Sequence, residues 1–281
     1  MNEQSIAVML ADDADAGLTH DYFASVLESF KRTIEQKDYR LAFLNPGYEN
    51  THRKRYLEQM KEGYAGLLIA CIDYQREEVK ELLTGDFPIL TIDCKREGVI
   101  NVTSDNRGGI REMVDYICGM GHKRIACITG DDTYITNVRK QALLEACSAH
   151  GVEIPAEYLF QSEYRNREKA IYYTEELLRM ETPPSCILYS DDVAAVAGLE
   201  ILRARGLEVP HDMSVAGYDG IITSSFYQPL LCTVKQDTAE LGKRAAERMM
   251  ALIEHPQTAD RNDIEVPTSL IKGRTIARVY Y

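Results

Sequence analysis

The sequence lacks the features that would place the chain in a membrane or on a secretory route. No stretch of the 281 residues approaches the roughly 20 consecutive apolar residues that a membrane-spanning helix needs. Residues 1–5 (MNEQS) do not form a basic segment ahead of an apolar one, so we expect no signal peptide. With 45% apolar and 27% charged residues, the composition is that of a folded globular protein. We therefore expect a cytoplasmic protein that does not contact the membrane.

Paired cysteines and positive charge are also scarce. The seven cysteines are an odd number, the closest two are Cys118 and Cys127, and there is no C-x-x-C pair. This pattern predicts buried free thiols in a reducing compartment rather than disulfides or a zinc or redox site. The 32 Lys and Arg residues against 44 Asp and Glu residues give a net charge of −12. Because non-specific DNA affinity comes from neutralising phosphates, the chain alone is not expected to hold DNA.

Known catalytic and cofactor motifs are missing as well. There is no G-x-S-x-G, H-E-x-x-H, G-x-x-x-x-G-K-[ST] or G-x-G-x-x-G, and no two of the six histidines have metal-binding spacing. The acidic segment with Asp12, Asp13 and Asp15 does not fit a calcium loop, because the twelfth residue counted from Asp13 is Ala24 instead of glutamate. These absences predict no enzyme, no metal and no cofactor.

The apolar pattern alternates between short strand-like runs and longer segments with helical spacing. One such helix is predicted from Tyr22, Val26, Leu27, Phe30 and Ile34, which repeat at intervals of three and four. The predicted strands are 6–10, 41–44, 67–69, 89–92, 125–129, 187–189 and 214–217. This order predicts an α/β fold with parallel sheets and helices on both faces. Roughly eleven β/α units are too many for one open sheet, which favours two Rossmann-like lobes.

In such sheets, ligands bind beyond the carboxyl ends of the strands, so the loops there are the candidate site. These loops are rich in Asp, Tyr, Thr, Asn and Gln, and they cover residues 11–21, 71–75, 105–109, 130–139, 190–192, 218–225 and 235–237. Adjacent acids such as Asp191 and Asp192 point different ways at a strand end. We expect one of them to face a cleft and the other to cap a helix that begins at Val193.

Segments along nearly the whole chain match a family in order. They are 102–109 (VTSDNRGG), 121–130 (GHKRIACITG), 189–195 (YSDDVAA), 207–219 (LEVPHDMSVAGYD), 231–237 (LCTVKQD), 241–242 (LG), 266–267 (VP) and 269–274 (SLIKGR). On these segments, and most specifically on 207–219, the chain resembles the effector-binding core of the LacI/GalR transcriptional regulators, which share the type I periplasmic-binding-protein fold.

The resemblance implies a periplasmic-binding-protein-like type I architecture with three crossovers between the lobes. The N-terminal lobe would comprise residues 5–104 plus 237–265, and the C-terminal lobe 105–236 plus 266–281. It also implies a homodimer formed along the side of both lobes, and a ligand cleft between the lobes. Family members carry a helix-turn-helix headpiece and a hinge before this core, whereas here the first predicted strand begins within five residues of Met1. We therefore expect operator DNA to be bound only through a headpiece that is absent from this chain.

Carried over by motif, the resemblance implies a set of ligand-contacting residues. Its polar members are Arg139, Asp191, Asp219, Gln236 and Asp105, and its aromatic members are Tyr22, Phe23 and Tyr164. Arginine offers a planar fork of donors, carboxylates accept from hydroxyls, and glutamine does both. Aromatic rings can lie against the C–H face of a sugar or against a base. At the position of Asp191 the family often has asparagine, which indicates a somewhat different ligand.

These side chains favour a neutral polyhydroxylated effector, a mono- or oligosaccharide, over an anionic one. The tyrosines leave a purine or nucleoside as an alternative. The resemblance then implies a ligand-gated regulator, expected to be a repressor, in which ligand closes a hinge and changes DNA binding. One rival is a sugar-binding solute receptor of a transport system, which the missing signal peptide and the cysteines disfavour. Another is an enzyme that uses Asp191 or Asp219 as a base, for which no nucleophile, metal or cofactor loop is present.

Overall fold

The computed structural model describes residues 4–10, 19–44, 63–70 and 87–280. The chain divides into two compact units, Met1–Ser104 with Asp237–Val266 and Asp105–Gln236 with Pro267–Tyr281. Each unit holds one six-stranded sheet, as the pattern of alternating strands and helices predicts, and the chain passes between the units three times. None of the helices within the described ranges is both long and apolar enough to cross a membrane.

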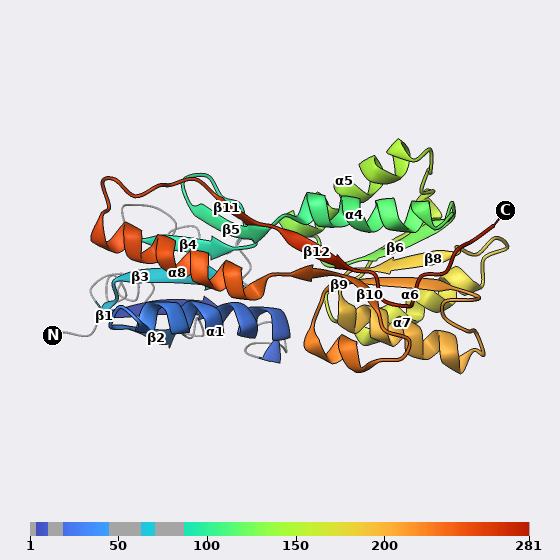
Figure 1. The fold of residues 1–281 in the computed structure, drawn as a ribbon, viewed down its shortest axis with the longest axis horizontal. Helices are drawn as coiled ribbons and strands as arrows, with labels where there is room; N and C mark the ends of the chain where they lie inside the picture. Colours follow the sequence, from blue (N-terminus) through green and yellow to red (C-terminus); the bar gives the residue numbers. More distant parts are fainter. Residues whose placement is uncertain (1–3, 11–18, 45–62, 71–86, 281) are drawn as a thin grey trace, which may run out of the picture. The chain divides into compact units, whose positions relative to one another are not determined.

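The sheet of the first unit is parallel throughout, in the order β11-β5-β4-β3-β1-β2. Its strands are β1 (Gln4–Leu10), β2 (Tyr39–Leu44), β3 (Gly66–Ala70), β4 (Ile89–Ile92), β5 (Ile100–Ser104) and β11 (Ile264–Val266). Helices α1 (Asp21–Glu35) and α8 (Thr238–Glu254) lie side by side on one face of this sheet (Figure 1). The five residues that predict α1 from their spacing are all buried against the sheet and α8.

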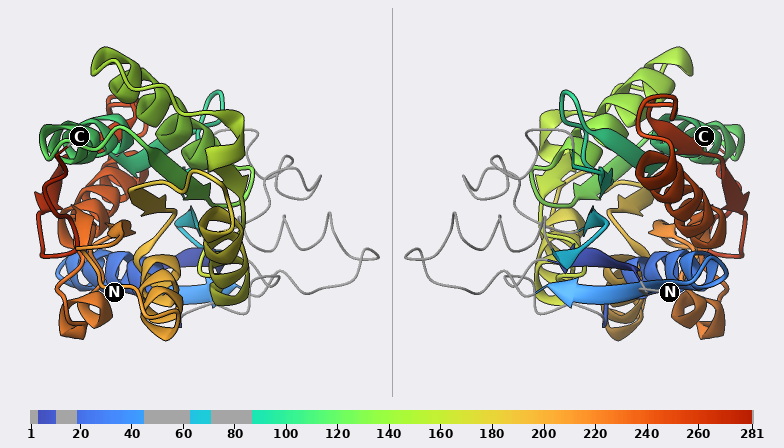
Figure 2. Two further views of the ribbon diagram at one scale, coloured as in Figure 1. Left: turned by 90° about the vertical axis from the view of Figure 1, so that its right-hand side faces the viewer. Right: turned by 90° about the vertical axis from the view of Figure 1, so that its left-hand side faces the viewer.

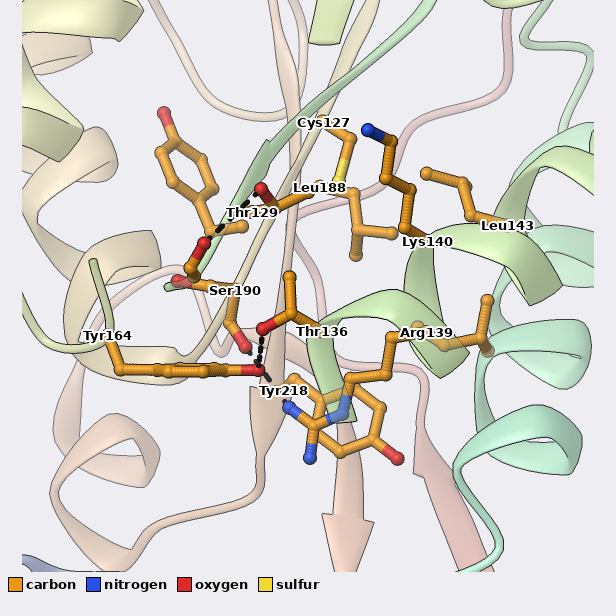
Figure 3. Close-up of a pocket in the computed structure, with 13 residues that line it drawn as sticks. Cys127, Thr129, Thr136, Arg139, Lys140, Leu143, Tyr164, Leu188, Ser190 and Tyr218 are labelled. Atoms are coloured by element: carbon orange, nitrogen blue, oxygen red, sulfur yellow. Dashed lines mark hydrogen bonds between the residues drawn. The ribbon is translucent and has the colours of Figure 1, made fainter. Parts of the chain in front are cut away.

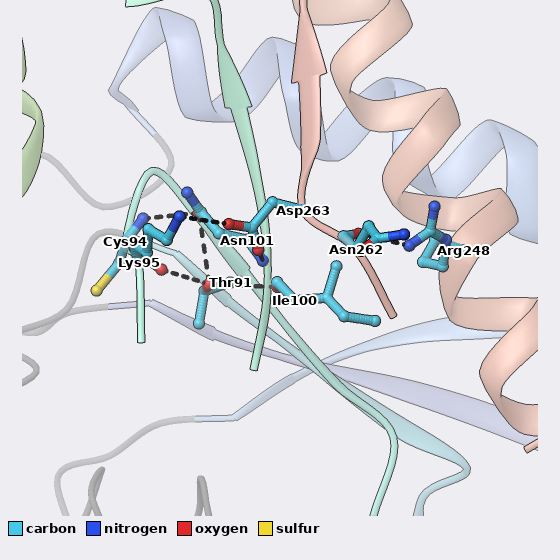
Figure 4. Close-up of polar contacts among 8 residues, drawn as sticks. All are labelled: Thr91, Cys94, Lys95, Ile100, Asn101, Arg248, Asn262 and Asp263. Atoms are coloured by element: carbon cyan, nitrogen blue, oxygen red, sulfur yellow. Dashed lines mark hydrogen bonds and ion pairs between the residues drawn. The ribbon is translucent and has the colours of Figure 1, made fainter. Parts of the chain in front are cut away.

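A polar cluster fixes the turn between β4 and β5 of the first unit (Figure 4). The Oδ1 atom of Asn101 accepts a hydrogen bond from the backbone N–H of Cys94 at 2.9 Å. The hydroxyl of Thr91 donates to the carbonyl of Cys94 at 2.6 Å, and the N–H of Asn101 donates to Asp263 at 3.0 Å. These bonds join β5 to the segment before β11, where the sheet has its edge.

The sheet of the second unit has the order β12-β10-β9-β8-β6-β7. Its strands are β6 (Ile125–Thr129), β7 (Leu159–Gln161), β8 (Cys186–Tyr189), β9 (Ser214–Asp219), β10 (Cys232–Gln236) and β12 (Thr268–Ile271). Five of them are parallel, and the edge strand β12 runs antiparallel to β10. The parallel sheets predicted from the sequence are thus confirmed, and β12 is an antiparallel edge strand that the sequence did not predict.

Alternation along these strands determines which helices cover each face. Ile125 and Cys127 of β6 are buried with α4 (Asn106–Gly119) and α5 (Tyr134–Ala149). Ala126 and Ile128 are buried on the opposite face, with α6 (Arg167–Leu178) and α7 (Asp192–Ala204). Both faces of this sheet are thus covered by helices, as the left view of Figure 2 shows. Two short 3₁₀ helices, η3 (Ala156–Tyr158) and η4 (Ile222–Phe226), complete this unit.

Several of the predicted loops after the strands are partly helical or lie beyond the described ranges. Residues 106–109 belong to α4, because the carboxylate of Asp105 caps that helix one residue after β5 ends. Helix α5 begins at Tyr134, because the hydroxyl of Thr133 accepts from the N–H of Thr136, and Arg139 therefore lies inside the helix. The predicted loop 71–75 and Asp12, Asp13 and Asp15 lie outside the described residues.

Candidate functional site

Five of the expected ligand residues come from the carboxyl edge of the second unit's sheet. Asp219 and Gln236 are the last residues of β9 and β10, and Asp191 follows β8. Arg139 comes from α5, the helix after β6, and Tyr164 follows β7. Ligands of open α/β sheets bind at this edge, so the fold itself places these side chains where a ligand is expected.

Arg139 is held by three neighbours from different elements, of which Figure 3 draws Tyr218 and Ser190. Its guanidinium carbon lies 3.6 Å from the centroid of the Tyr218 ring, within the range of a cation–π contact. Its Nε donates to Oδ1 of Asn106 at 2.7 Å, and the Tyr218 hydroxyl donates to the same oxygen at 3.1 Å. Its Nη1 donates to the carbonyl of Ser190 at 3.4 Å. The guanidinium plane is therefore fixed before any ligand arrives.

The ring of Tyr164 lies on the other side of this cluster. Its hydroxyl is 2.9 Å from that of Thr136, and the ring centroid is 6.0 Å from the guanidinium carbon of Arg139. Gly130, just after β6, makes room for the ring, because a Cβ there would lie 2.5 Å from the Tyr164 ring. Burial raises the pKa of the Tyr164 hydroxyl, so it stays protonated and can donate as well as accept.

These residues enclose a small cavity within the second unit. Its volume is about 30 Å³, which is room for one or two water molecules. The residues that line it include Arg139, Tyr164, Tyr218, Thr136 and Ser190, of which Figure 3 labels all five. An aromatic wall with a fixed guanidinium and several hydroxyls is suited to bind a polar, uncharged group.

Asp219 and Gln236 form a second part of the edge. The Nε2 of Gln236 donates to Oδ1 of Asp219 at 2.7 Å, while Oε1 of the buried Gln236 has no hydrogen-bond partner among the residues that the structure describes. Asp219 has a φ of 103°, a left-handed conformation that non-glycine residues adopt mainly at constrained sites. Desolvation raises the pKa of Asp219 well above its usual range, although the positive charge of Arg139 opposes the shift. This edge therefore holds acceptor capacity that none of the described residues uses.

Asp191 and Asp192 have structural partners. Asp191 caps α7, since its Oδ1 accepts from the N–H of Ala194 at 2.9 Å. Its Oδ2 accepts from the N–H of Arg165 at 2.9 Å and from the Ser190 hydroxyl at 2.8 Å. One of the two acids is a cap, as expected, but α7 begins at Asp192 instead of Val193.

Asp192 accepts hydrogen bonds from three groups of the surrounding chain. The Thr233 hydroxyl donates to Oδ1 at 2.6 Å, and the Ile221 N–H and the Ser224 hydroxyl donate to Oδ2 at 2.9 and 3.0 Å. Desolvation raises the pKa of this buried carboxyl to about 7. Asp192 therefore joins the segment containing η4 to the sheet, and it is not among the residues that line the cavity.

The remaining expected residues also have partners of their own. The carboxylate of Asp105 accepts from the N–H of Gly108 at 2.7 Å, and a Cβ at position 108 would lie 2.0 Å from that carboxylate. In the first unit, the hydroxyl of Tyr22 donates to Asp93 at 2.7 Å, and its ring is buried in the core. Phe23 is half-buried and packs against Tyr22 with a centroid distance of 5.0 Å. Capping and packing thus account for Asp105 and Tyr22.

Sequence reasoning missed two residues of the Arg139 cluster, Asn106 and Tyr218. Both lie inside segments that match the LacI/GalR regulators, Asn106 in 102–109 and Tyr218 in 207–219, but the sequence does not mark either residue as part of a ligand site. Asn106 is 3% exposed and Tyr218 1% exposed, so both resemble ordinary core residues. Only the contact with Arg139 identifies them as parts of the site.

Among the residues that the structure describes, no group of three or more His, Cys, Asp or Glu side chains is arranged to hold a metal ion. Six of the seven cysteines lie in the described ranges, and all six are free. Five of these are buried, as the sequence predicts, and Cys118 is partly exposed.

Comparison with known proteins identifies a matching protein family and similar transcriptional repressors. The family described as periplasmic binding protein-like domain matches residues 114–276, more than half of the chain. A repressor from Mannheimia succiniciproducens, HTH-type transcriptional repressor PurR, is 28% identical over 92% of this chain and 78% of its own. The probable HTH-type transcriptional repressor ExuR of Bacillus subtilis is 28% identical over 89% of this chain and 74% of its own.

Solved structures with the same fold include several regulators. A putative LacI transcriptional regulator from Bacillus cereus subsp. cytotoxis superposes with a TM-score of 0.88 at 23% identity, covering 99% of each chain. The complex of the regulator CelR with cellobiose gives 0.84 at 21% identity, over 96% of this chain and 84% of that one. The lac repressor dimer bound to operator and an anti-inducer gives 0.82 at 21% identity, over 98% and 94%. At these identities the likeness shows the fold.

Proposed function

This chain belongs to the family of periplasmic binding protein-like domains, as the effector-binding core of a LacI/GalR-type transcription regulator, and from that premise we propose that it senses a sugar. The effector contacts the carboxyl edge of the second unit's sheet, around Arg139, Tyr164, Asp219 and Gln236. Its binding changes the affinity of the regulator for DNA, and the two affinities influence each other reciprocally.

The observation that carries the sugar proposal is that Oε1 of buried Gln236, beside Asp219, is unpaired within the described part of the chain. A buried acceptor without a donor costs free energy, which a ligand hydroxyl recovers by donating to it. A sugar hydroxyl also accepts, and the fixed guanidinium of Arg139 supplies donors. The Tyr164 ring offers an apolar surface for the C–H face of a sugar ring. The cellobiose complex of CelR supports a sugar in this fold.

Calorimetric titration with a panel of pentoses, hexoses, disaccharides and purines tests this proposal. We expect saturable heat from a sugar in the wild type and a loss of affinity of about 10- to 100-fold in Arg139→Ala, since charge-assisted hydrogen bonds contribute about 1.5–3 kcal/mol. Arg107→Ala is the matched control, because Arg107 lies on α4 and pairs with exposed Glu145 at 2.9 Å.

Each result of the titration bears on a separate part of the proposal. Heat from a purine but from no sugar contradicts the effector class while keeping the sensor. Unchanged affinity in Arg139→Ala removes Arg139 from the site. Silence from the whole panel contradicts the sugar proposal.

We further propose that the chain forms a homodimer through an apolar surface at η4. Ile222 and Phe226 lie one at each end of η4 and are 77% and 78% exposed, which is unusual for large apolar side chains. Phe226→Glu is expected to shift the protein to monomer in sedimentation velocity, because a charge in an apolar interface is costly. Tyr172→Glu on α6, where Tyr172 is 56% exposed, is the control and should leave the dimer intact. A monomeric wild type refutes the dimer.

A further inference from the structure

The cavity beside Arg139 has a polar side at the carboxyl edge of the sheet. Arg139 and Thr136 reach it from the first two turns of α5, and Tyr164 reaches it from the segment after β7. Arg139 and Tyr164 belong to the proposed sugar site. The cavity therefore borders that site.

The other side of the cavity is apolar. Figure 3 shows Cys127, Leu143 and Leu188 together in the upper part of the view, away from Tyr164, and Ile110 is a fourth apolar residue of the lining. The four residues come from β6, α5, β8 and α4, respectively. All of them are buried, with exposed fractions from 1% to 6%, and they belong to the same core cluster. The cavity thus extends from the proposed sugar site toward the core between the sheet and two helices.

Two residues on the apolar side carry polar groups, but neither makes that side polar. Burial raises the pKa of the Cys127 thiol to about 12, so the thiol stays uncharged. Lys140 is an exposed residue, so its ammonium group can stay in water while its methylene groups cover the cavity. A ligand group on this side therefore meets mainly carbon and sulfur atoms.

The hydroxyl groups that line the cavity already take part in hydrogen bonds within the second unit. They are those of Thr129, Thr136, Tyr164, Tyr189, Ser190 and Tyr218. The Tyr189 hydroxyl, for example, is 2.7 Å from that of Thr174. A water molecule held inside a protein typically needs about three hydrogen-bond partners. Since the protein uses these hydroxyls itself, the cavity is better suited to an apolar group than to a further hydroxyl.

The volume of the cavity limits the size of that group. At about 30 Å³, the cavity has room for one or two water molecules. A methyl group is about as large as a water molecule and therefore fits, whereas a second sugar ring does not.

We propose that the effector is a 6-deoxyhexose, whose methyl group enters this cavity between Cys127, Leu143 and Leu188. This inference rests on the proposed function and names the class of sugar. The methyl group is the one apolar substituent of such a sugar, so the ring hydroxyls stay at the polar edge with Arg139 and Gln236. An ordinary hexose carries a hydroxyl on the same carbon, and that hydroxyl would lose its water in the cavity without gaining an equal partner.

Calorimetric titration of the full chain with matched sugar pairs tests this inference. The two members of each pair share one configuration and differ only in the hydroxyl on carbon 6. The pairs are L-fucose with L-galactose, L-rhamnose with L-mannose, D-fucose with D-galactose, and 6-deoxy-D-glucose with D-glucose. We expect one 6-deoxy sugar to bind about 10- to 100-fold more tightly than its partner, which is the discrimination that one small group in an apolar pocket gives.

Variants that fill the cavity separate its contribution from that of the polar edge. Cys127→Val adds volume of about one methyl group to the apolar side, and Leu143→Phe adds more. In both variants the preference for the 6-deoxy member of the pair should disappear, because the methyl group can no longer enter. Leu144→Phe is the matched control, since Leu144 is the next residue of α5, is 36% exposed and is not among the residues that line the cavity. Denaturant unfolding shows which variants are folded, and Cys127→Val, the smaller change, serves alone if Leu143→Phe does not fold.

Three results would overturn the inference. The first is a sugar that binds with no preference for its 6-deoxy form, or a sugar outside these pairs as the sole ligand; either leaves the proposed sugar sensing in place. The second is a 6-deoxy preference that survives when Cys127→Val and Leu143→Phe are folded, which puts the methyl group elsewhere. The third is the absence of binding by every sugar, which contradicts the proposed function and the inference together.

Discussion

In each sheet, the fourth strand along the chain leads to an aspartate with a positive φ angle, but the side chains around the two aspartates differ. Asp93 follows β4 and Asp219 ends β9, the corresponding strand of the other sheet, and both have positive φ angles, 56° and 103°. Each carboxylate accepts a hydrogen bond from the next strand along the sheet. The donor is the Thr103 hydroxyl at 2.6 Å in the first unit and Gln236 Nε2 at 2.7 Å in the second.

The second oxygen of Asp93 accepts from the Tyr22 hydroxyl at 2.7 Å, so hydroxyl donors of its own unit serve both oxygens. Beside Asp219, by contrast, Gln236 Oε1 accepts from none of the described residues, and Arg139 places a positive charge nearby. The same backbone conformation is therefore fully bonded within one unit, while in the other it lies beside a polar atom that no described residue pairs, which is where we propose that the effector binds. The fold alone does not decide between these uses; the side chains next to the carboxylate do.

The largest expected effect concerns the buried carboxyl of Asp192, near Asp219 in the second unit. The pKa of Asp192 is raised from 3.8 to about 7, so folding favours its protonated form. Its contribution to stability is fully present below pH 3.8 and is lost as the pH rises through 7. At about 1.4 kcal/mol per pKa unit, the loss amounts to about 4 kcal/mol.

Urea unfolding of the wild type and of Asp192→Asn across pH 4–8 measures this loss. We expect the difference in unfolding free energy between the two proteins to change with pH, by up to about 4 kcal/mol over the whole range. A constant offset is expected as well, because the single amide oxygen of an asparagine cannot accept from Ile221, Ser224 and Thr233 at once. A pH-independent difference would show that Asp192 is ionised throughout.

The next prediction compares the side chains that donate to these two aspartates, Gln236 beside Asp219 and Thr103 beside Asp93. Gln236→Met removes the amide beside Asp219 with little change of volume, and Thr103→Val removes the hydroxyl beside Asp93. We expect Gln236→Met to lower sugar affinity about 10- to 100-fold with little change in stability, because the buried, unpaired Oε1 is lost together with one hydrogen bond. Thr103→Val should lower stability by about 1–2 kcal/mol and leave affinity unchanged.

Calorimetry and denaturant unfolding of both variants give this comparison in full. If Thr103→Val weakens binding as much as Gln236→Met does, the edge with Asp93 also takes part in ligand binding, and the contrast between the units fails.

The smallest expected effect concerns two helix caps. Asp105 caps α4 and Asp237 caps α8, with nearly the same ψ angles, 77° and 78°. Replacing either by alanine should lower stability by about 1 kcal/mol, whereas Asp105→Asn, which keeps the cap, should have almost no effect. If Asp105→Asn retains stability but loses sugar binding, Asp105 contacts the ligand as well as capping the helix. Thermal unfolding and calorimetry distinguish these results.

Much of the fold follows from local sequence, because hydrophobic spacing reflects burial directly. The five residues that predict α1 are its five buried ones, and predicted strands 89–92 and 125–129 match β4 and β6. Boundaries were less predictable, since Asp105 and Thr133 begin helices inside expected loops through hydrogen bonds that spacing does not encode.

The sequence predicts which residues of the candidate site follow the strands. It does not predict which of these residues contact one another. Position after a strand brings Arg139, Asp219 and Gln236 to one edge. Whether a carboxylate at this edge already accepts hydrogen bonds from the protein depends on donors far away in sequence. One example is Asp191, which accepts from the N–H of Arg165. Asn106 joins Arg139 to Tyr218 across 33 and 112 positions of sequence, which no local pattern can reveal.

Two of the three passages between the units begin next to these contacts. Gln236 is the last residue of the second unit before Asp237, and Asn106 is the second residue after the chain enters that unit at Asp105. A change of backbone torsion at either residue therefore travels along covalent bonds, one or two peptide links from the boundary. For the effector site proposed above, this means that the main chain itself joins the proposed ligand contacts to the boundary of the units, without a relay of side chains.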